Sequence, residues 1–205
     1  MNNRYKLIIF DLIDTLASSE SISESTKILE QEIGIEMVDF IIGGGKIDTE
    51  KSVDDVITRV KNFKNISDEQ EKMIRIWIEP SGTVLLDNSI EILKYLKEKS
   101  YLVGIISNSP PTKQEQLKDL GIDSYIDSAI FSFECGYRKP NKEIYDIFLK
   151  RFDVLPTEVL MIGDSLKNDV LGAQSAGLDA ILLDQNDNID FQPKIKNLLE
   201  LKNIL

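Results

Sequence analysis

Short apolar runs alternate with amphipathic stretches along most of the chain. The apolar runs have the length and composition of buried strands, and we expect strands at 6–10, 102–106, 129–131, 159–162 and 180–183. Between them, apolar residues recur with the period of a helix, which predicts helices near 89–97, 113–120, 141–152, 167–176 and 192–202. Repeated strand–helix units with short connections predict a doubly wound α/β fold, in which helices cover both faces of a parallel sheet.

The segment between the first strand and residue 87 departs from this alternation and is typical of helices. Ser67-Asp-Glu-Gln70, like Ser21-Ile-Ser-Glu24, has the pattern of a capping box, and 52–63 carries apolar residues at helical spacing. We therefore predict a core formed by 1–16 and 87–205 and an inserted helical cap at 17–86. The insertion could merely shield the sheet, but its departure directly after the first strand favours a lid over the strand ends.

The predicted cap contains large aromatic residues. We expect Trp77 and Phe63 to fill a small core of the cap's own. The cap carries no motif that names a substrate, and the oligomeric state is left open.

Composition places the chain among globular proteins of the cytoplasm. Of its 205 residues, 42% are hydrophobic and 29% are charged, and no apolar run approaches the roughly 18 residues of a membrane helix. The first residues lead into a strand without a signal-peptide pattern. A single cysteine, Cys135, excludes an intramolecular disulfide and fits a reducing compartment. We expect no membrane association.

Charge and histidine content narrow the chemistry further. The formal net charge of −11 argues against nucleic acid as a partner and suits binding of divalent cations. The chain has no histidine, which excludes Ser-His-Asp and Cys-His catalysis and every His-ligated zinc site. Acids, lysines and hydroxyls must therefore carry any reaction.

Polar side chains follow four of the predicted strands, at the edge of the sheet where ligands of such folds bind. They are Asp11 after the first strand, Ser107 and Asn108 after the second, Lys139 beyond the third, and Asp164 and Asp169 after the fourth. The three acids supply the hard oxygen ligands that Mg²⁺ prefers. The lysine, hydroxyl and amide can hold a phosphate, and a carboxylate can attack phosphorus to form an acyl phosphate.

These segments together resemble the haloacid dehalogenase superfamily, whose members are mostly phosphatases with an aspartate nucleophile. Phe10-Asp11-Leu-Ile-Asp-Thr15-Leu is similar to its first motif and Ile106-Ser107-Asn108 to its second. Arg138-Lys139-Pro140 is similar to the third. Gly163-Asp164-Ser-x-x-Asn-Asp169, continued by Gly172-Ala-x-x-Ala-Gly177, is similar to the fourth and is the most specific.

The resemblance assigns roles to these residues. It implies Asp11 as the nucleophile, Ser107 and Lys139 as positioners of phosphate and nucleophile, and Asp164 as a metal ligand. It also implies that the main-chain carbonyl of Ile13 completes the Mg²⁺ shell. The function it implies is Mg²⁺-dependent hydrolysis of a small phosphorylated metabolite, with the insertion closing over substrate.

The chain departs from the family pattern at Ile13. Phosphatases of the family carry Asp there, which protonates the leaving group and then activates water. Loss of a general acid/base costs about 10²- to 10⁴-fold in rate, so we expect slow turnover or a preference for activated esters. Asp14 is one position away in extended chain, and we interpret it as a turn residue in the place of the family's usual glycine rather than as a substitute acid.

Two alternatives remain. A catalytically weakened member would bind a phospho-ligand or a protein partner through an intact metal site. A metal-independent 2-haloacid dehalogenase would also lack the second Asp, but that branch usually has an aromatic residue at this place and a cap arginine. The predicted cap has no arginine before Arg59, and the retained metal-site acids disfavour this branch.

Overall fold

The structure is a computed structural model of the chain, and it describes residues 4–18, 31–32, 52–78, 82–109 and 116–205. Its centre is a six-stranded sheet, in which every neighbouring pair is parallel. The strand order is β5-β4-β1-β6-β7-β8. The strands are β1 (Leu7–Phe10), β4 (Leu102–Ser107), β5 (Ser128–Phe131), β6 (Val159–Gly163), β7 (Asp179–Leu183) and β8 (Lys194–Ile195).

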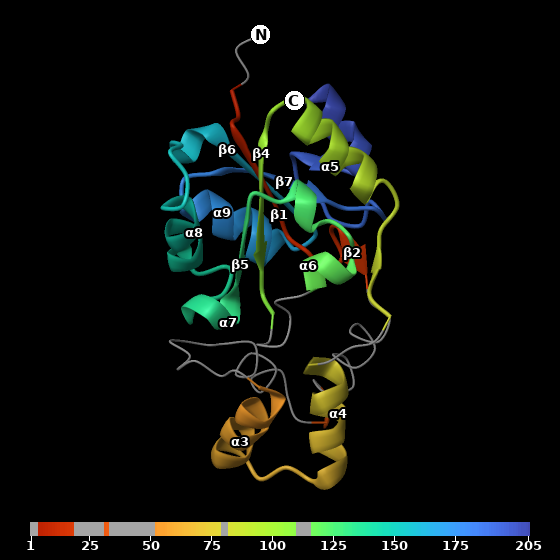
Figure 1. Cartoon of the computed structure of the whole chain (residues 1–205), viewed down its shortest axis with the longest axis vertical. Coiled ribbons are helices and arrows are strands. Elements are labelled where there is room, and N and C mark those ends of the chain that lie inside the picture. Colours follow the sequence, from red (N-terminus) through yellow and green to blue (C-terminus); the bar gives the residue numbers. More distant parts are fainter. Residues whose placement is uncertain (1–3, 19–30, 33–51, 79–81, 110–115) are drawn as a thin grey trace.

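Helical segments cover both faces of this sheet (Figure 1). One face packs against α5 (Ser89–Glu98), α6 (Gln116–Asp119) and the 3₁₀ segment η4 (Leu198–Asn203). The other packs against α8 (Lys142–Leu149), the π-helical segment η3 (Leu166–Leu171) and α9 (Gly172–Ser175). Successive side chains of β1 point to opposite faces, so Ile8 and Phe10 join one apolar cluster and Leu7 and Ile9 the other. The predicted doubly wound α/β fold is confirmed.

Shorter elements complete the core. They are α7 (Ser132–Cys135) after β5, and the 3₁₀ turns η1 (Asp123–Tyr125) and η2 (Pro156–Glu158). A small antiparallel pair, β2 (Ala17–Ser18) and β3 (Val84–Leu85), joins the two points where the chain leaves and re-enters the core. The segment between these strands thus starts and ends at one place beside β1.

Two described helices of this segment lie beyond the carboxyl ends of the strands (Figure 1). They are α3 (Val53–Phe63) and α4 (Asp68–Ile78). The capping box predicted at Ser67 is present, because its hydroxyl accepts from the Gln70 amide at 3.2 Å and its own amide donates to the Gln70 side chain at 3.1 Å. The division into a core and a cap at 17–86 stays a prediction, and Ser21, Glu24 and the glycines at 43–45 lie outside the described residues.

Three details differ from expectation. The predicted helix at 192–202 is instead strand β8 followed by η4, because Lys194 and Ile195 extend the sheet beside β7. Phe63 does not fill a cap core, since it is 63% exposed, and the side chain of Trp77 lies outside the described part. Asn88 precedes α5 as expected, but its side chain makes no capping hydrogen bond.

Among the described helices, none is long and apolar enough to cross a membrane.

Candidate active site

Asp11 directly follows β1, the strand between β4 and β6 near the middle of the sheet. Phe10 is in register with Ile105 of β4 and Ile162 of β6, and the Asp11 amide donates to the Ile162 carbonyl at 2.9 Å. The end of β4 at Ser107 and the end of β6 just before Asp164 are therefore its immediate neighbours. The sheet brings three of the four sequence motifs to one edge.

Lys139 supplies the fourth motif and lies inside the cluster. Its Nζ donates to Asp11 Oδ1 and to Asp169 Oδ1, each at 2.6 Å, and only 2% of its side chain is exposed. Burial opposes the charge of the ammonium, but the two carboxylates outweigh it and raise the pKa of Lys139. The lysine is therefore held as a cation between the first and fourth motifs.

The fourth motif is a tight turn that folds one carboxylate back toward β6. Asp169 Oδ2 accepts from the Ser165 amide at 2.9 Å, while Oδ1 accepts from Lys139. A Cβ on Gly163 would lie far inside van der Waals contact with the Asp169 carboxylate, so glycine is required at that position. The π-helical segment that follows is a rare backbone form concentrated at functional sites.

Three carboxylates meet at this place. One ligand oxygen each of Asp11, Asp164 and Asp169 lies within 4.8 Å of the other two. Burial raises the pKa of Asp164, and the nearby charges of Asp11 and Asp169 raise it further. Burial also raises the pKa of Asp11, with Lys139 acting in the opposite direction. One ammonium does not balance three carboxylates, so the cluster favours either a proton or an added cation.

The second motif contributes one hydroxyl and one amide, which have different surroundings. Ser107 is buried at the end of β4, and its hydroxyl lies 3.0 Å from that of Ser109. The Asn108 side chain instead binds the main chain of Lys139, donating to its carbonyl at 3.0 Å and accepting from its amide at 2.8 Å. Its side chain therefore clamps the lysine segment, a role that the sequence did not suggest.

The segment after Asp11 turns sharply. Ile13 is half-buried and forms an isolated bridge with Ala17, and Asp14 has a positive φ of 61°. This left-handed backbone fits the interpretation of Asp14 as a turn residue. Asp14 and Asp164 both line a cavity of about 420 Å³ that extends toward the loop after β7.

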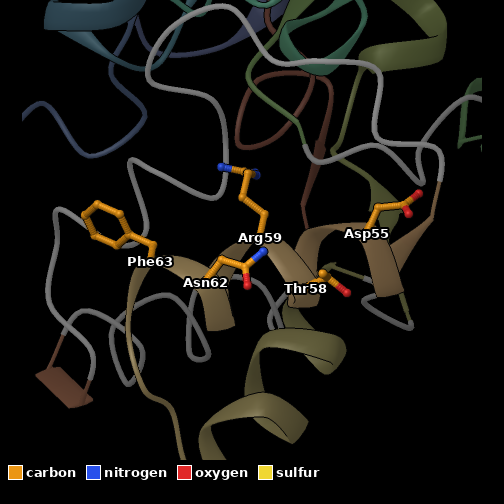
Figure 2. Close-up of a pocket in the computed structure, with 5 residues that line it drawn as sticks. All are labelled: Asp55, Thr58, Arg59, Asn62 and Phe63. Atoms are coloured by element: carbon orange, nitrogen blue, oxygen red, sulfur yellow. The ribbon is translucent and has the colours of Figure 1, made fainter.

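A separate hollow of about 470 Å³ lies against α3. Figure 2 shows Arg59 and Asn62 beside each other there, with Phe63 projecting to one side. Its described lining residues are Asp55, Thr58, Arg59, Asn62 and Phe63. These residues all belong to one helix, so this hollow includes no residue of the four motifs. Lys46, in the same predicted cap, lies outside the described residues.

Several contacts around the cluster involve residues to which the sequence assigned no role. The Thr15 hydroxyl lies 3.5 Å from Asp164 Oδ1, and the Ser109 amide donates to the Ser132 hydroxyl at 3.0 Å. The Tyr145 hydroxyl donates to the Asn168 carbonyl at 2.6 Å. Thr15 could have been found from its place in the first motif, whereas the other contacts join distant segments and have no local signal.

Comparison with known protein families shows to which family the chain belongs. The haloacid dehalogenase-like hydrolase family matches residues 5–177, most of the chain. The chain is a haloacid dehalogenase-like hydrolase. The match includes all four motifs whose side chains meet at the carboxyl edge of the sheet.

Individual relatives of this hydrolase are phosphatases. A glyceraldehyde 3-phosphate phosphatase of Methanothermobacter thermautotrophicus is 40% identical over 97 residues, which span 47% of this chain and 43% of the relative. A protein of the same name from Pyrococcus furiosus is 27% identical over 87% of this chain and 80% of its own length.

Solved structures show the same fold at lower identity. A HAD phosphatase from Thermococcus onnurineus superposes with a TM-score of 0.67 at 23% identity, covering 97% of each chain. The HAD-hydrolase YfnB from Bacillus subtilis gives a TM-score of 0.68 at 24% identity, covering 98% of this chain and 99% of the other.

Proposed function

We propose that this hydrolase cleaves phosphoric monoesters of small metabolites through a covalent phosphoryl group on Asp11. The observation that carries the proposal is the buried contact of Asp11 with Lys139, with Asp164 and Asp169 beside it. The family match and the phosphatase relatives support the same class of reaction.

The residues have complementary tasks in this reaction. A carboxylate oxygen of Asp11 forms a bond to phosphorus as the bond from phosphorus to the leaving oxygen breaks. Lys139 orients the attacking carboxylate and offsets the negative charge of the phosphoryl group, and Ser107 donates a hydrogen bond to one of its oxygens. Water then attacks phosphorus, which releases inorganic phosphate and regenerates the Asp11 carboxylate.

The same residues fit a resident Mg²⁺ ion. Asp11, Asp164 and Asp169 offer carboxylate oxygens, the ligand type that Mg²⁺ prefers, and their unbalanced negative charge favours a divalent cation. We assign Asp11, Asp164 and the Ile13 carbonyl to the ion, with Asp169 beside them. When bound, the ion would neutralise charge on the phosphoryl oxygens.

Ile13 sets the efficiency of this chemistry. Its hydrocarbon side chain can neither protonate the leaving oxygen nor take a proton from water, so both steps rely on solvent. An ester with a good leaving group needs no proton in the first step, which leaves hydrolysis of the acyl phosphate as the slow step. The same substitution favours a second function, in which the site retains a phospho-ligand or partner without turnover.

A steady-state assay separates these functions. Hydrolysis of p-nitrophenyl phosphate and of an acyl phosphate is measured with and without Mg²⁺, in the wild type, Asp11→Asn and Ile13→Asp. We expect Mg²⁺-dependent turnover that Asp11→Asn abolishes and Ile13→Asp raises by about 10²- to 10⁴-fold, the usual worth of a general acid/base.

The other outcomes have separate meanings. No turnover by the wild type, with turnover gained in Ile13→Asp, would support the binding function and refute the hydrolase. Halide release from 2-haloacids without metal would instead establish a dehalogenase.

A further inference from the structure

Tyr145 reaches from α8 to the turn that carries the fourth motif. It is fully buried, and its hydroxyl donates to the main-chain carbonyl of Asn168 at 2.6 Å. Asn168 immediately precedes Asp169, whose carboxylate binds both Lys139 and the Ser165 amide. One hydrogen bond therefore links α8 to the backbone beside a central acid of the site.

The hydroxyl is not needed to fill space. A phenylalanine would occupy the same apolar volume, and burying a hydroxyl is unfavourable unless it is paired. Burial raises the pKa of Tyr145, so the phenol stays protonated near neutral pH and remains a donor. The specific consequence of having tyrosine here is thus the bond to Asn168.

Close packing on two sides holds α8, and with it Tyr145, in a fixed place. A Cβ on Gly172 would lie 2.8 Å from the Tyr145 hydroxyl and 3.0 Å from Pro140 Cα. A Cβ on Gly104 would lie 2.6 Å from the ring of Phe148, one turn along the same helix. Both glycines let α8 approach closely, so the hydroxyl meets the turn from a rigid support.

We infer that Tyr145 is a positioning residue for the cation site: its hydroxyl holds η3, so that Asp169 within it and Asp164 just before it face Asp11 and Lys139. The inference rests on the proposed function, because it concerns the cation that this function requires. Tyr145 acts indirectly, through the Asn168 carbonyl, and itself touches no reacting atom. Partners that orient metal ligands in this way are typically worth about 10- to 100-fold in metal affinity or activity.

The chain offers a matched control. Tyr101 is also buried, and its hydroxyl donates to a main-chain oxygen of Leu205 at 3.0 Å. This bond ties Leu205 to the residue just before β4, at the opposite edge of the sheet from the acids. Tyr101→Phe and Tyr145→Phe therefore each remove one hydrogen bond from a buried tyrosine hydroxyl to a main-chain oxygen, and each should lower the free energy of unfolding by about 1–3 kcal/mol.

Calorimetric titration with Mg²⁺ alone tests the inference without relying on turnover. We expect the Kd for Mg²⁺ to rise about tenfold in Tyr145→Phe and to stay unchanged in Tyr101→Phe, while thermal unfolding shows a loss of stability in both. An unchanged Kd in Tyr145→Phe, or an equal rise in both variants, would overturn it.

The wild-type titration separates the role of Tyr145 from the proposed function. If the wild type binds no Mg²⁺, the proposed metal-dependent function fails, and the role of Tyr145 falls with it. If the wild type binds Mg²⁺ and Tyr145→Phe binds it equally well, the proposed function stands and only the role of Tyr145 is refuted.

Discussion

The ammonium of Lys139 lies 2.6 Å from the carboxylate of Asp11, although 128 residues separate them in the chain. Both groups are buried, and Lys139 shares its charge with a second carboxylate, Asp169. The pair thus connects the proposed nucleophile to the acids that would hold a cation. Losing either partner should disturb both reaction and stability.

Replacing Lys139 by Met removes the only cation in contact with these buried acids among the described residues. Breaking a buried ion pair from one side costs roughly 3–5 kcal/mol, because the remaining charge stays buried without a partner. We expect urea unfolding to show a loss of this size, together with loss of turnover.

Lys142→Met provides the control. Lys142 pairs with Asp146 at the same distance, 2.6 Å, but the two side chains are 52% and 42% exposed. Exposed pairs contribute little, so this variant should resemble the wild type. An equally small effect of both substitutions would show that burial of the Lys139 pair has no energetic consequence.

Gly163→Ala should damage the site more than the fold. The new Cβ would lie far inside van der Waals contact with the Asp169 carboxylate, so this carboxylate would have to shift away from its bonds to Lys139 and the Ser165 amide. Changes to groups that orient metal ligands typically cost about 10- to 100-fold in metal affinity. We therefore expect Mg²⁺ binding to weaken at least tenfold. Isothermal titration with Mg²⁺ measures it.

Gly121→Ala is the comparison for that variant. Gly121 lies between α6 and η1, outside the four motifs, and has a positive φ of 67°; apart from its chain neighbours, no atom of the described residues lies within 4 Å of an added Cβ. A left-handed backbone costs a residue with a Cβ about 1–2 kcal/mol, so stability should fall while Mg²⁺ affinity should not change. If Gly163→Ala bound Mg²⁺ as tightly as Gly121→Ala does, the tight packing of Asp169 would be irrelevant to the cation.

The charge of Asp164 should make the metal-free protein less stable as pH rises. Burial raises the pKa of Asp164 to about 7 in the folded protein, against about 3.9 in an unfolded chain. Between these values the folded state keeps a proton that the unfolded state has lost, so stability falls with rising pH and levels off above about 7. With chelator present, Asp164→Asn should therefore melt above the wild type at pH 8.

The size and the pH dependence of the Tm difference between Asp164→Asn and the wild type show whether ionisation of Asp164 causes it. Each 1 kcal/mol corresponds to about 2–4 °C in Tm for a domain of this size, and the difference should vanish near pH 4. Saturating Mg²⁺ should reverse the order, because a ligand of the folded state stabilises the wild type. A Tm difference that did not change with pH would exclude ionisation of Asp164 as its source.

The sheet and the placement of the motifs were largely predictable from the chain. The strand before Asp11 and the strand before Asp164 are almost entirely apolar, and parallel strands bring the residues at their carboxyl ends to one edge. Lys139 comes after β5 and α7, yet its position in the third motif predicted that it would lie at the site. Local pattern and topology were sufficient for these residues.

Other features depend on contacts between distant segments, which the sequence pattern does not encode. The Asn108 side chain follows a strand like a ligand-binding residue, and its contacts with the main chain of Lys139 could not be predicted from that position. Tyr145 occupies a core position of a helix, and only its bond to Asn168 distinguishes it from any buried aromatic residue. The polar 192–202 segment has helical spacing, but pairing with β7 turns its first part into a strand.

Covalent trapping on Asp11 tests the central claim most directly. With no acid or base at Ile13, the attack of water on the aspartyl phosphate is the slow step, so this intermediate should accumulate. The protein is mixed with p-nitrophenyl phosphate and Mg²⁺, quenched in acid, and examined by peptide mass spectrometry. We expect one phosphoryl group on Asp11 in the wild type, much less in Ile13→Asp, and none in Asp11→Asn. Turnover without a phosphoryl group on Asp11, or the same label in Asp11→Asn, would contradict the account.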